Sequence, residues 1–454
     1  MRQVKIGPQG IRGSVHNGLE IEQLIDLVSA FATWVEAGPV LITRDTRPSS
    51  PMLAFAVRSA LSASGCDVFD VGVCPTAVAQ IEAAARDVAG MISITGAHND
   101  AHWNGLKLMG ASGAVLSSAE GREVLDLWHQ DDYLRARTEH LGRTHHLGDP
   151  FSRYLDAVTS WVDTEAIAKA DLRVVVDACN GAGSLVVPEL CERLGVTLIP
   201  LSCQAGQGFP HPPDPTVVNL AQVAAIMAPV QAEIGFGLSS DCGRIAVVTS
   251  DGRALGRRAT LPLVAEHLLS QAAAEDVSRK VLAGATCDSR VYHVAERYGA
   301  EVVRCGVGAQ AVIERLRIED GLLGGDDSGG VAIARNHLAY DGLGVLATLL
   351  EAVAIRGSAD ALADALPEAH ARMATLPCPI NSAYSAVARM RDRLDPERVE
   401  DVDGLRVEID EGWYHVRVSH TEPLLRVTCE ATTRALADDL LALVTMQLRA
   451  AIQG

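Results

Sequence analysis

A short polar loop that follows an apolar run carries the side chains best suited to chemistry. Residues 88–92 predict a buried strand that ends in a small-residue loop at residues 94–100. Loops at strand ends often do chemistry, because a rigid scaffold aims their side chains. The imidazole of His98 could accept a phosphoryl group or a hydrogen bond, and Lys107 supplies positive charge. Position 97 is alanine, so the loop has no nucleophilic hydroxyl there.

A second candidate site is the glycine-dense segment at residues 5–13, which surrounds Arg12. Glycines let backbone amides approach a bound anion, and an arginine fork grips phosphate oxygens with two hydrogen bonds. Alone, this segment would be interpreted as a surface turn with a solvated arginine. Residues 41–50 follow it and predict a strand, a turn with two arginines and the start of a helix.

The elements that must position these loops follow an α/β pattern. A strand, a glycine turn and a helix recur in three successive parts of the chain, which indicates an architectural repeat. In the last part, two alternating strands joined by a short turn predict a β-hairpin. Beyond residue 150, helices are expected at residues 151–162, 185–194, 261–274, 291–298 and 434–452, strands at residues 172–177, 281–287, 301–308, 404–410 and 413–418, and a linker at residues 357–370.

The loop at residues 95–107 resembles the active-site loop of the α-D-phosphohexomutases, Thr-x-Ser-His-Asn-Pro followed by Asn-Gly-x-Lys. This family includes phosphoglucomutase, phosphomannomutase and phosphoglucosamine mutase. Its loop serine carries a phosphoryl group, which it gives to one hydroxyl of a sugar phosphate and takes back from another. Ala97 replaces this serine and Asp100 the proline, so the resemblance implies that the usual covalent step is lost. The matching residues are Thr95, His98, Asn99, Asn104, Gly105 and Lys107.

Further family motifs follow in the family's order along nearly the whole chain. Residues 10–13 keep Gly-Ile-Arg-Gly of an N-terminal motif, and residues 43–50 match a segment that supports the catalytic loop in the family. The resemblance implies an α/β fold: three similar α/β domains with mixed sheets plus a C-terminal α+β (TATA-binding-protein-like) domain, around a central cleft. We assign residues 1–150 to domain I with the degenerate phosphoserine loop, 151–252 to domain II with a degenerate metal loop, 253–370 to domain III with the sugar-binding loop, and 371–454 to domain IV with the phosphate-binding loop.

Residues 239–244 correspond to the family's magnesium loop, Asp-Gly-Asp-x-Asp-Arg. Only Asp241 survives of its three aspartates, because Ser239 and Gly243 stand at the other two places. Mg²⁺ prefers several anionic oxygens in octahedral geometry, so most of the charge that holds the ion in the family is gone. Arg244, which faces the phosphoserine in the family, is kept. Changes in both halves of one site favour natural divergence over a single engineered substitution.

Residues 324–330 resemble the family loop that binds sugar hydroxyls, Gly-[Gly/Glu]-Glu-x-Ser-Gly-His. Asp326 replaces the glutamate and Ser328 is kept, and both side chains can hydrogen-bond to ring hydroxyls. Gly330 replaces a histidine that is a candidate proton-transfer group in the family.

Residues 417–426 give the most specific match, to the family's phosphate-binding loop Arg-x-Ser-Gly-Thr-Glu-Pro-x-x-Arg. Only the glycine has changed, to His420. The resemblance implies that hydroxyls, backbone amides and an arginine surround the non-transferring phosphate. The residues assigned to this substrate site are Arg417, Ser419, Thr421 and Arg426.

Composition argues against several classes of partner. The formal net charge of −18 disfavours nonspecific binding to nucleic acid or to an anionic membrane. The sequence has no apolar stretch long enough to span a bilayer, and its first motif begins too early to leave room for a signal peptide. The ten cysteines contain no C-x-x-C pair, so we expect no disulfide framework and a cytoplasmic location.

We therefore expect a phosphohexomutase homologue that binds a hexose phosphate without the phosphoserine and Mg²⁺ chemistry, as a pseudoenzyme or a regulatory subunit. The alternative is an active isomerase, an intramolecular phosphotransferase that uses hexose 1,6-bisphosphate and a substitute group such as His98, Ser93 or Cys242. Mg²⁺ stays open as a cofactor of that alternative. A metal site at His98, Asp100 and His102 is a minor alternative. We expect a monomer or homodimer, and a partner subunit could complete the site.

Overall fold

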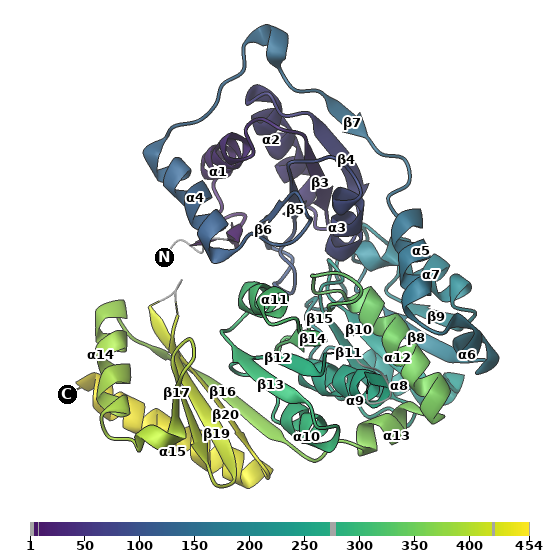
Figure 1. Ribbon diagram of the computed structural model, residues 1–454, viewed down its shortest axis with the longest axis vertical. Coiled ribbons are helices and arrows are strands. Elements are labelled where there is room, and N and C mark those ends of the chain that lie inside the picture. The colour runs from purple at the N-terminus through teal and green to yellow at the C-terminus, as the bar shows by residue number, and fades with distance from the viewer. Residues whose placement is uncertain (1–3, 8, 273–277, 420–422, 454) are drawn as a thin grey trace.

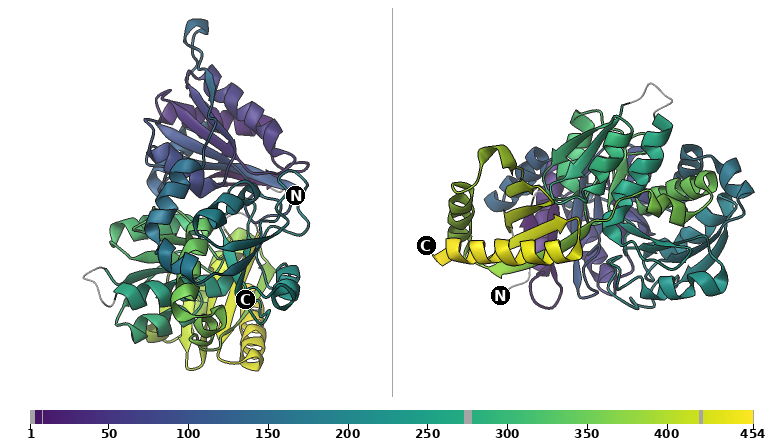
Figure 2. Two further views of the ribbon diagram at one scale, coloured as in Figure 1. Left: turned by 90° about the vertical axis from the view of Figure 1, so that its right-hand side faces the viewer. Right: turned by 90° about the horizontal axis from the view of Figure 1, so that it is seen from below.

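The computed structural model describes residues 4–7, 9–272, 278–419 and 423–453. They form a four-domain α/β architecture in which each domain has its own sheet, and the first three sheets are mixed. Domain I lies at the top of Figure 1, domains II and III lie below it, and domain IV lies at the lower left, beside domain III. Figure 2 shows the same arrangement from two further sides. Within the described ranges, no helix is both long and apolar enough to cross a membrane.

Domain I is built on a seven-stranded sheet in the order β1-β2-β6-β5-β3-β4-β7. Strand β5 is buried along its whole length, as its apolar run predicts. It is parallel to β3 and antiparallel to β6, so the polar loop joins two paired strands at the carboxyl end of β5. The strands are β1 (Val4–Gly7), β2 (Gly10–Ser14), β3 (Val40–Arg44), β4 (Val68–Val73), β5 (Gly90–Ile94), β6 (Trp103–Gly110) and β7 (Thr144–His146), and the helices are α1 (Ile21–Trp34), α2 (Ser50–Ala63), α3 (Thr76–Ala84), α4 (Ser118–Gln130) and the short η1 (Thr138–His140).

Domain II has a four-stranded sheet in the order β11-β10-β8-β9, in which only β11 is antiparallel to its neighbour. The loop at residues 239–244 joins β10 to β11 and therefore lies at the carboxyl end of β10. The elements are α5 (Ser152–Trp161), α6 (Thr164–Lys169), β8 (Arg173–Asp177), η2 (Ala182–Leu185), α7 (Val187–Arg193), β9 (Thr197–Leu201), α8 (Ala221–Val230), β10 (Ile234–Leu238) and β11 (Ile245–Thr249).

Domain III repeats this plan with the strand order β13-β12-β14-β15. Strands β14 and β15 are antiparallel, and the loop between them carries the predicted sugar-binding residues. The elements are η3 (Arg257–Ala259), α9 (Thr260–Ala272), β12 (Lys280–Gly284), α10 (Arg290–Arg297), β13 (Glu301–Cys305), α11 (Ala309–Ile318), β14 (Leu323–Gly325), β15 (Val331–Ile333), α12 (Gly342–Arg356) and α13 (Ala359–Asp364).

Two expectations for domain III were wrong. Residues 306–308 do not continue the strand, because Gly308 has φ +102° and turns the chain into α11. The expected linker contains α13, which begins after Gly357 ends α12 in a left-handed conformation. Ser358 caps the new helix by accepting a hydrogen bond from the N–H of Ala361 (3.0 Å).

Domain IV is an antiparallel sheet in the order β16-β20-β19-β18-β17 with two helices. The predicted hairpin is present, and Ile409 pairs with Gly412 across its turn. Its buried apolar residues form a cluster of their own, whereas another cluster runs through domains II and III into domain I. The elements are β16 (His370–Pro377), α14 (Ile380–Arg391), η4 (Pro396–Arg398), β17 (Val399–Asp401), β18 (Leu405–Ile409), β19 (Gly412–Val418), β20 (Leu424–Ala431) and α15 (Arg434–Gln453).

Candidate active site

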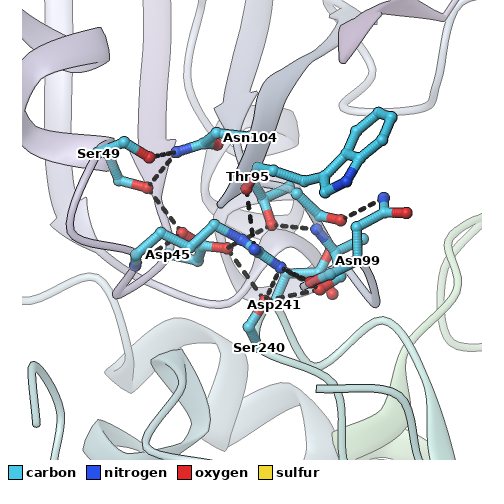
Figure 3. Close-up of polar contacts among 12 residues, drawn as sticks. Asp45, Ser49, Thr95, Asn99, Asn104, Ser240 and Asp241 are labelled. Atoms are coloured by element: carbon cyan, nitrogen blue, oxygen red, sulfur yellow. Dashed lines mark hydrogen bonds and ion pairs between the residues drawn. The ribbon is translucent and has the colours of Figure 1, made fainter. Parts of the chain in front are cut away.

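The loop between β5 and β6 holds Ala97 in a left-handed backbone conformation, with φ +49°. The N–H of Ala97 donates to Oγ1 of Thr95 (2.8 Å), and this hydroxyl donates to Oδ2 of Asp45 (2.7 Å) (Figure 3). A residue with a Cβ rarely adopts this conformation, and it persists where surrounding contacts determine it. The alanine therefore stands in a firmly supported position.

Arg47, which follows β3, supplies most of that support. Its buried guanidinium pairs with Asp45 (Nε to Oδ2, 2.9 Å) and donates to four backbone carbonyls of the loop. A Cβ at Gly96 would lie 2.6 Å from Cζ of Arg47, so only glycine fits there. The four accepting carbonyls belong to Ala97 (2.7 Å), Asn99 (2.6 Å), Asp100 (2.5 Å) and Trp103 (2.9 Å).

Ser240 connects this loop to domain II. Its buried hydroxyl lies 2.9 Å from the carbonyl oxygen of Ala97 and 3.0 Å from Oδ2 of Asp45 (Figure 3). The N–H of Thr76, at the start of α3, donates to the carbonyl of Asp241 (3.2 Å). The predicted catalytic and metal loops therefore lie against each other.

Lys107 and Asp241 form an ion pair across the same boundary, with 2.5 Å between Nζ and Oδ2. Burial raises the pKa of the Asp241 carboxyl, but the Lys107 ammonium and Arg244 outweigh it and hold this pKa well below its usual range. The other oxygen, Oδ1, accepts hydrogen bonds from Oγ of Ser239 (2.9 Å) and from the N–H of Gly243 (3.2 Å). Both oxygens of the carboxylate thus have partners within the protein.

These residues do not fit Mg²⁺. The three positions converge, since a Cβ at Gly243 would lie 3.4 Å from Oδ1 of Asp241. Only Asp241 carries a carboxylate, and Lys107 already neutralises it. Among the described residues, no three His, Cys, Asp or Glu side chains are grouped as metal ligands would be.

His98 stands among positive charges. The charge of Arg244, then burial, then the charge of Arg12 hold the pKa of His98 well below its ordinary value, so its imidazole is neutral at pH 7. Arg12 lies on β2, opposite Gly105 of β6. Within the described structure, neither Nδ1 of His98 nor Nε of Arg244 has a hydrogen-bond partner, although both atoms are buried. Such unpaired groups are unfavourable unless a ligand or water satisfies them.

The other proposed substitute groups are enclosed. Ser93 is buried, and its hydroxyl pairs with Oγ1 of Thr76 (2.9 Å). Burial, followed by the charge of Asp241, raises the pKa of the fully buried Cys242 thiol, which disfavours the nucleophilic thiolate. His102, which was considered only as a metal ligand, is exposed, and its ring packs edge-to-face against His16 with 5.9 Å between the ring centroids.

In the predicted sugar-binding loop, Asp326 and Ser328 contact each other. Both the N–H (2.9 Å) and the hydroxyl (2.5 Å) of Ser328 donate to Oδ1 of Asp326. Burial and the charge of Asp327 raise the pKa of the Asp326 carboxyl, and the charge of Arg244 opposes them. Arg244 thus lies close enough to influence both this loop and His98.

The phosphate-binding loop connects β19 and β20, where Arg417 lies directly opposite Arg426. Two like charges in register repel, and an anion between them would relieve this repulsion. Nη1 of Arg417 lies 3.4 Å from Oδ2 of Asp403, and the buried Ser419 donates its N–H to the carbonyl of Leu424 (3.0 Å). Thr421 and His420 lie outside the described residues.

Sequence reasoning did not single out Arg47, Ser240 or Tyr340. Arg47 lies in a segment that matched the family as a whole, so its supporting role had a sequence signal. Ser240 occupies the Gly position of the family's Asp-Gly-Asp triplet, and Tyr340 precedes the helix-starting Asp341-Gly342. Neither residue type indicates a function by itself.

Comparisons with known proteins agree with this geometry. The chain matches the family models described as phosphoglucomutase/phosphomannomutase α/β/α domains I, II and III over residues 3–135, 152–252 and 258–370, and the C-terminal domain over residues 365–445. It is 31% identical to a probable phosphoglucosamine mutase of Pyrococcus abyssi, over 96% of this chain and 95% of the relative.

Solved structures of this family share the fold. A phosphoglucomutase/phosphomannomutase family protein of Burkholderia thailandensis is 28% identical over 98% of this chain and 97% of its own, with a TM-score of 0.83. An Aspergillus fumigatus N-acetylphosphoglucosamine mutase, a serine-to-alanine variant in complex with glucose 1,6-bisphosphate, is 14% identical over 99% of this chain and 96% of its own (TM-score 0.61) and shows the fold alone. The chain belongs to the phosphoglucomutase/phosphomannomutase family, the α-D-phosphohexomutases.

Proposed function

We propose that this phosphohexomutase homologue binds a hexose phosphate and does not run the family's phosphoserine cycle. One observation carries the proposal: the loop that would present a serine is fully supported by Arg47 and Ser240, yet it presents the methyl group of Ala97. A methyl group cannot carry a phosphoryl group. The arginines and hydroxyls that would bind the ligand are kept in the sequence.

The proposed binding needs no Mg²⁺. In the family the ion would meet three aspartates, whereas here one carboxylate remains and Lys107 neutralises it at 2.5 Å. A bound Mg²⁺ would have to displace this ammonium and find its other ligands among neutral groups. We therefore expect hexose phosphate affinity to be the same with and without the ion.

We further propose that the preferred ligand carries two phosphates, as hexose 1,6-bisphosphate does. Three arginines, Arg244, Arg12 and Arg257, act on His98 with their positive charge. In the family a phosphoserine balances charge of this kind, whereas Ala97 carries no phosphate. Arg417 and Arg426 form a second cationic pair on domain IV. A ligand with a phosphate at each end could satisfy both. Glucose 1,6-bisphosphate, the ligand of the Aspergillus fumigatus variant, is the natural probe.

Calorimetric titration tests the proposal. The panel is glucose, mannose and glucosamine 6-phosphates together with glucose 1,6-bisphosphate, each with and without Mg²⁺. We expect the bisphosphate to bind at least tenfold more tightly than any monophosphate, with no effect of Mg²⁺. A parallel assay with glucose 1-phosphate, a trace of bisphosphate and Mg²⁺ should show no turnover; turnover at the rate of an ordinary mutase would contradict the proposal, as would no binding of any panel member.

A second candidate function is phosphotransfer through His98. Its neutral imidazole with an unpaired Nδ1 is the observation that favours it, because in the tautomer protonated at Nε2 this atom has a free lone pair that can act as the nucleophile. Transfer from the bisphosphate to Nδ1 would release the monophosphate and leave acid-labile phosphate on the protein. The measurement is ³¹P NMR of the incubated protein before and after acid treatment. If no acid-labile phosphate is found on the protein, this route is excluded.

The proposal includes a cytoplasmic location. All ten cysteines are free thiols in the structure and nine of them are buried, which suits a reducing compartment. It also includes a monomer or homodimer as the working assembly, which sedimentation would test.

A further inference from the structure

Position 330 shows how the sugar-binding loop has been rebuilt. The family loop has a histidine there, whereas this chain has Gly330. A Cβ at Gly330 would lie 2.0 Å from Cδ2 and 2.4 Å from Cε2 of Tyr340. The aromatic ring of Tyr340 therefore fills the space where any side chain at position 330 would begin.

Backbone hydrogen bonds fix Tyr340 beside the two loops discussed above. The N–H of Asp341 donates to the carbonyl of Val331 (3.1 Å), and the N–H of Gly342 donates to that of Cys242 (2.8 Å). The N–H of Ile245 donates to the carbonyl of Gly329 (3.1 Å). Residues 242–245, 329–331 and 340–342 are thus joined, and this brings Tyr340 next to Arg244 and the sugar-binding loop.

The hydroxyl of Tyr340 lies beside the carboxyl of Asp326 in the sugar-binding loop. It is buried, and within the described structure no group meets the geometry of a hydrogen bond to it. Burial and the neighbouring Asp326 carboxyl raise the pKa of this hydroxyl, so it stays protonated and can donate. A buried donor without a well-aligned partner is unfavourable, and a ligand oxygen in better geometry would relieve this cost.

Among the described residues, two more polar atoms of the candidate site are buried and unpaired. Nε of Arg244 and Nδ1 of His98 are also buried and unpaired, and the charge of Arg244 acts on both His98 and Tyr340. The three groups come from domains I, II and III. An oxygen-rich ligand placed between them would satisfy all three.

We infer that Tyr340 is a ligand-contacting residue that takes the place of the histidine at position 330, with its hydroxyl donating a hydrogen bond to an oxygen of the bound phosphosugar beside Arg244 and His98. This inference rests on the proposed function, because it names a further contact of the same site. It assigns a specificity role to a residue outside the motifs that identify the family.

Tyr340→Phe is the direct test, because it removes one oxygen and keeps the ring that fills the site. We expect glucose 1,6-bisphosphate to bind at least tenfold more weakly in calorimetry. The Tm of the free protein should change little, since the variant loses no well-aligned hydrogen bond and only the polar contact with Asp326.

Tyr298→Phe is the matched control. The Tyr298 hydroxyl donates to Oε1 of Glu266 (2.7 Å) within domain III, so its removal should lower the Tm and leave the affinity unchanged. If Tyr340→Phe behaves like this control, or binds the bisphosphate as tightly as the wild type, the inference is overturned while the proposed function stands. If the wild type binds no hexose phosphate, the proposed function fails and this inference with it.

An exchange of the two positions tests the shared space. Gly330→His alone should lower the Tm strongly, because its Cβ meets the Tyr340 ring, and adding Tyr340→Ala should restore much of the loss. In the double variant the affinity for the bisphosphate should exceed that of Tyr340→Ala and should vary with pH near the pKa of imidazole. A double variant that is no more stable than Gly330→His alone would contradict the geometry.

Discussion

Ala97 keeps a left-handed conformation that alanine does not favour by itself. Such a conformation costs about 1–2 kcal/mol for a residue with a Cβ, so the contacts to Arg47 and Ser240 must offset it. The protein therefore maintains the shape of the loop although Ala97 has no hydroxyl to phosphorylate. At the residue scale this separates two features: the support of the loop, which is present, and a side-chain hydroxyl at position 97, which the sequence lacks.

If Ser239 and Gly243 are the reason why the site does not fit Mg²⁺, aspartates at these two positions should create a metal site. In Ser239→Asp/Gly243→Asp, the new carboxylates would converge on Asp241, because Oγ of Ser239 lies 2.9 Å and a Cβ at position 243 would lie 3.4 Å from its Oδ1. We expect the Tm of this variant to rise with Mg²⁺, by the equivalent of about 2.7 kcal/mol at a hundred times the Kd. The wild type, as the control, should show no shift.

Adding Ala97→Ser to that double variant should then supply the nucleophile. We expect the triple variant to take up phosphate from glucose 1,6-bisphosphate that resists acid, as a phosphoserine does, and to gain Mg²⁺-dependent mutase activity at least tenfold above the double variant. Mass spectrometry locates the phosphate. A triple variant with metal binding but no phosphoserine would show that more than these three side chains has diverged.

His415 makes the stability of domain IV depend on pH. Burial lowers its pKa from 6.5 to about 4, and its Nε2 lies 3.2 Å from the carbonyl of Val402. Because the unfolded chain binds the proton more readily, this stability is fully present above pH 6.5 and is lost as the pH falls towards 4, to a total of about 3 kcal/mol. His415→Gln should flatten the decline of the domain's Tm between pH 6.5 and 4.5; an identical decline would contradict the assignment.

At the scale of elements, the site consists of loops at the carboxyl ends of buried strands, and one arginine sets the shape of the first loop. Arg47→Met would remove the donor that four loop carbonyls share and the ion-pair partner of Asp45. Removing one partner of a buried ion pair costs about 3–5 kcal/mol. We expect the Tm of domain I to fall by about 10 °C and the affinity for the bisphosphate to fall with it.

The control for this prediction is Arg193→Met, whose arginine pairs with Asp156 and Glu189 on an exposed surface of domain II. Exposed pairs contribute about 0–1 kcal/mol, so the Tm should change by less than about 3 °C. Equal shifts in the two variants would show that Arg47 does not organise the loop. Scanning calorimetry resolves the two cases.

These elements also show what a sequence can predict. The apolar pattern placed both ends of α5 and α15 and the start of α9 within one residue, and glycine-rich motifs placed the site loops at strand ends. Residues 273 and 274 of the predicted α9 lie outside the described residues. Helices α11 and α13 were missed for different reasons. Helix α11 follows Gly308, whose positive φ ends the expected strand, and α13 has only six residues and depends on a cap by Ser358. Within the site, the role of Tyr340 could not be predicted. Its ring packs where a side chain at Gly330 would begin, and this contact exists only in the folded chain.

At the scale of the whole molecule, domain IV is attached differently from the others. It has its own apolar core, and the contacts that join it to domain III are largely polar. Arg258 of domain III pairs with Glu430 (2.6 Å), Arg406 donates to the carbonyl of Ala285 (2.6 Å), and Asp403 accepts from the N–H of Val307 (3.0 Å). Asp403 also contacts Arg417, so one carboxylate links the phosphate-binding loop to domain III.

The polar attachment makes ligand affinity depend on a residue that need not touch the ligand. Arg258→Met leaves Glu430 and Asp327 without their common partner, so domain IV should dock less firmly. We expect a larger radius of gyration by small-angle scattering and about tenfold weaker binding of glucose 1,6-bisphosphate, because ordering domain IV then costs part of the binding free energy. Arg372→Met, which breaks an exposed pair with Asp438 inside domain IV, should change neither quantity. A weaker affinity without a change in radius would mean that Arg258 acts on the ligand directly, and the second phosphate would then lie nearer to domain III than the phosphate-binding loop implies.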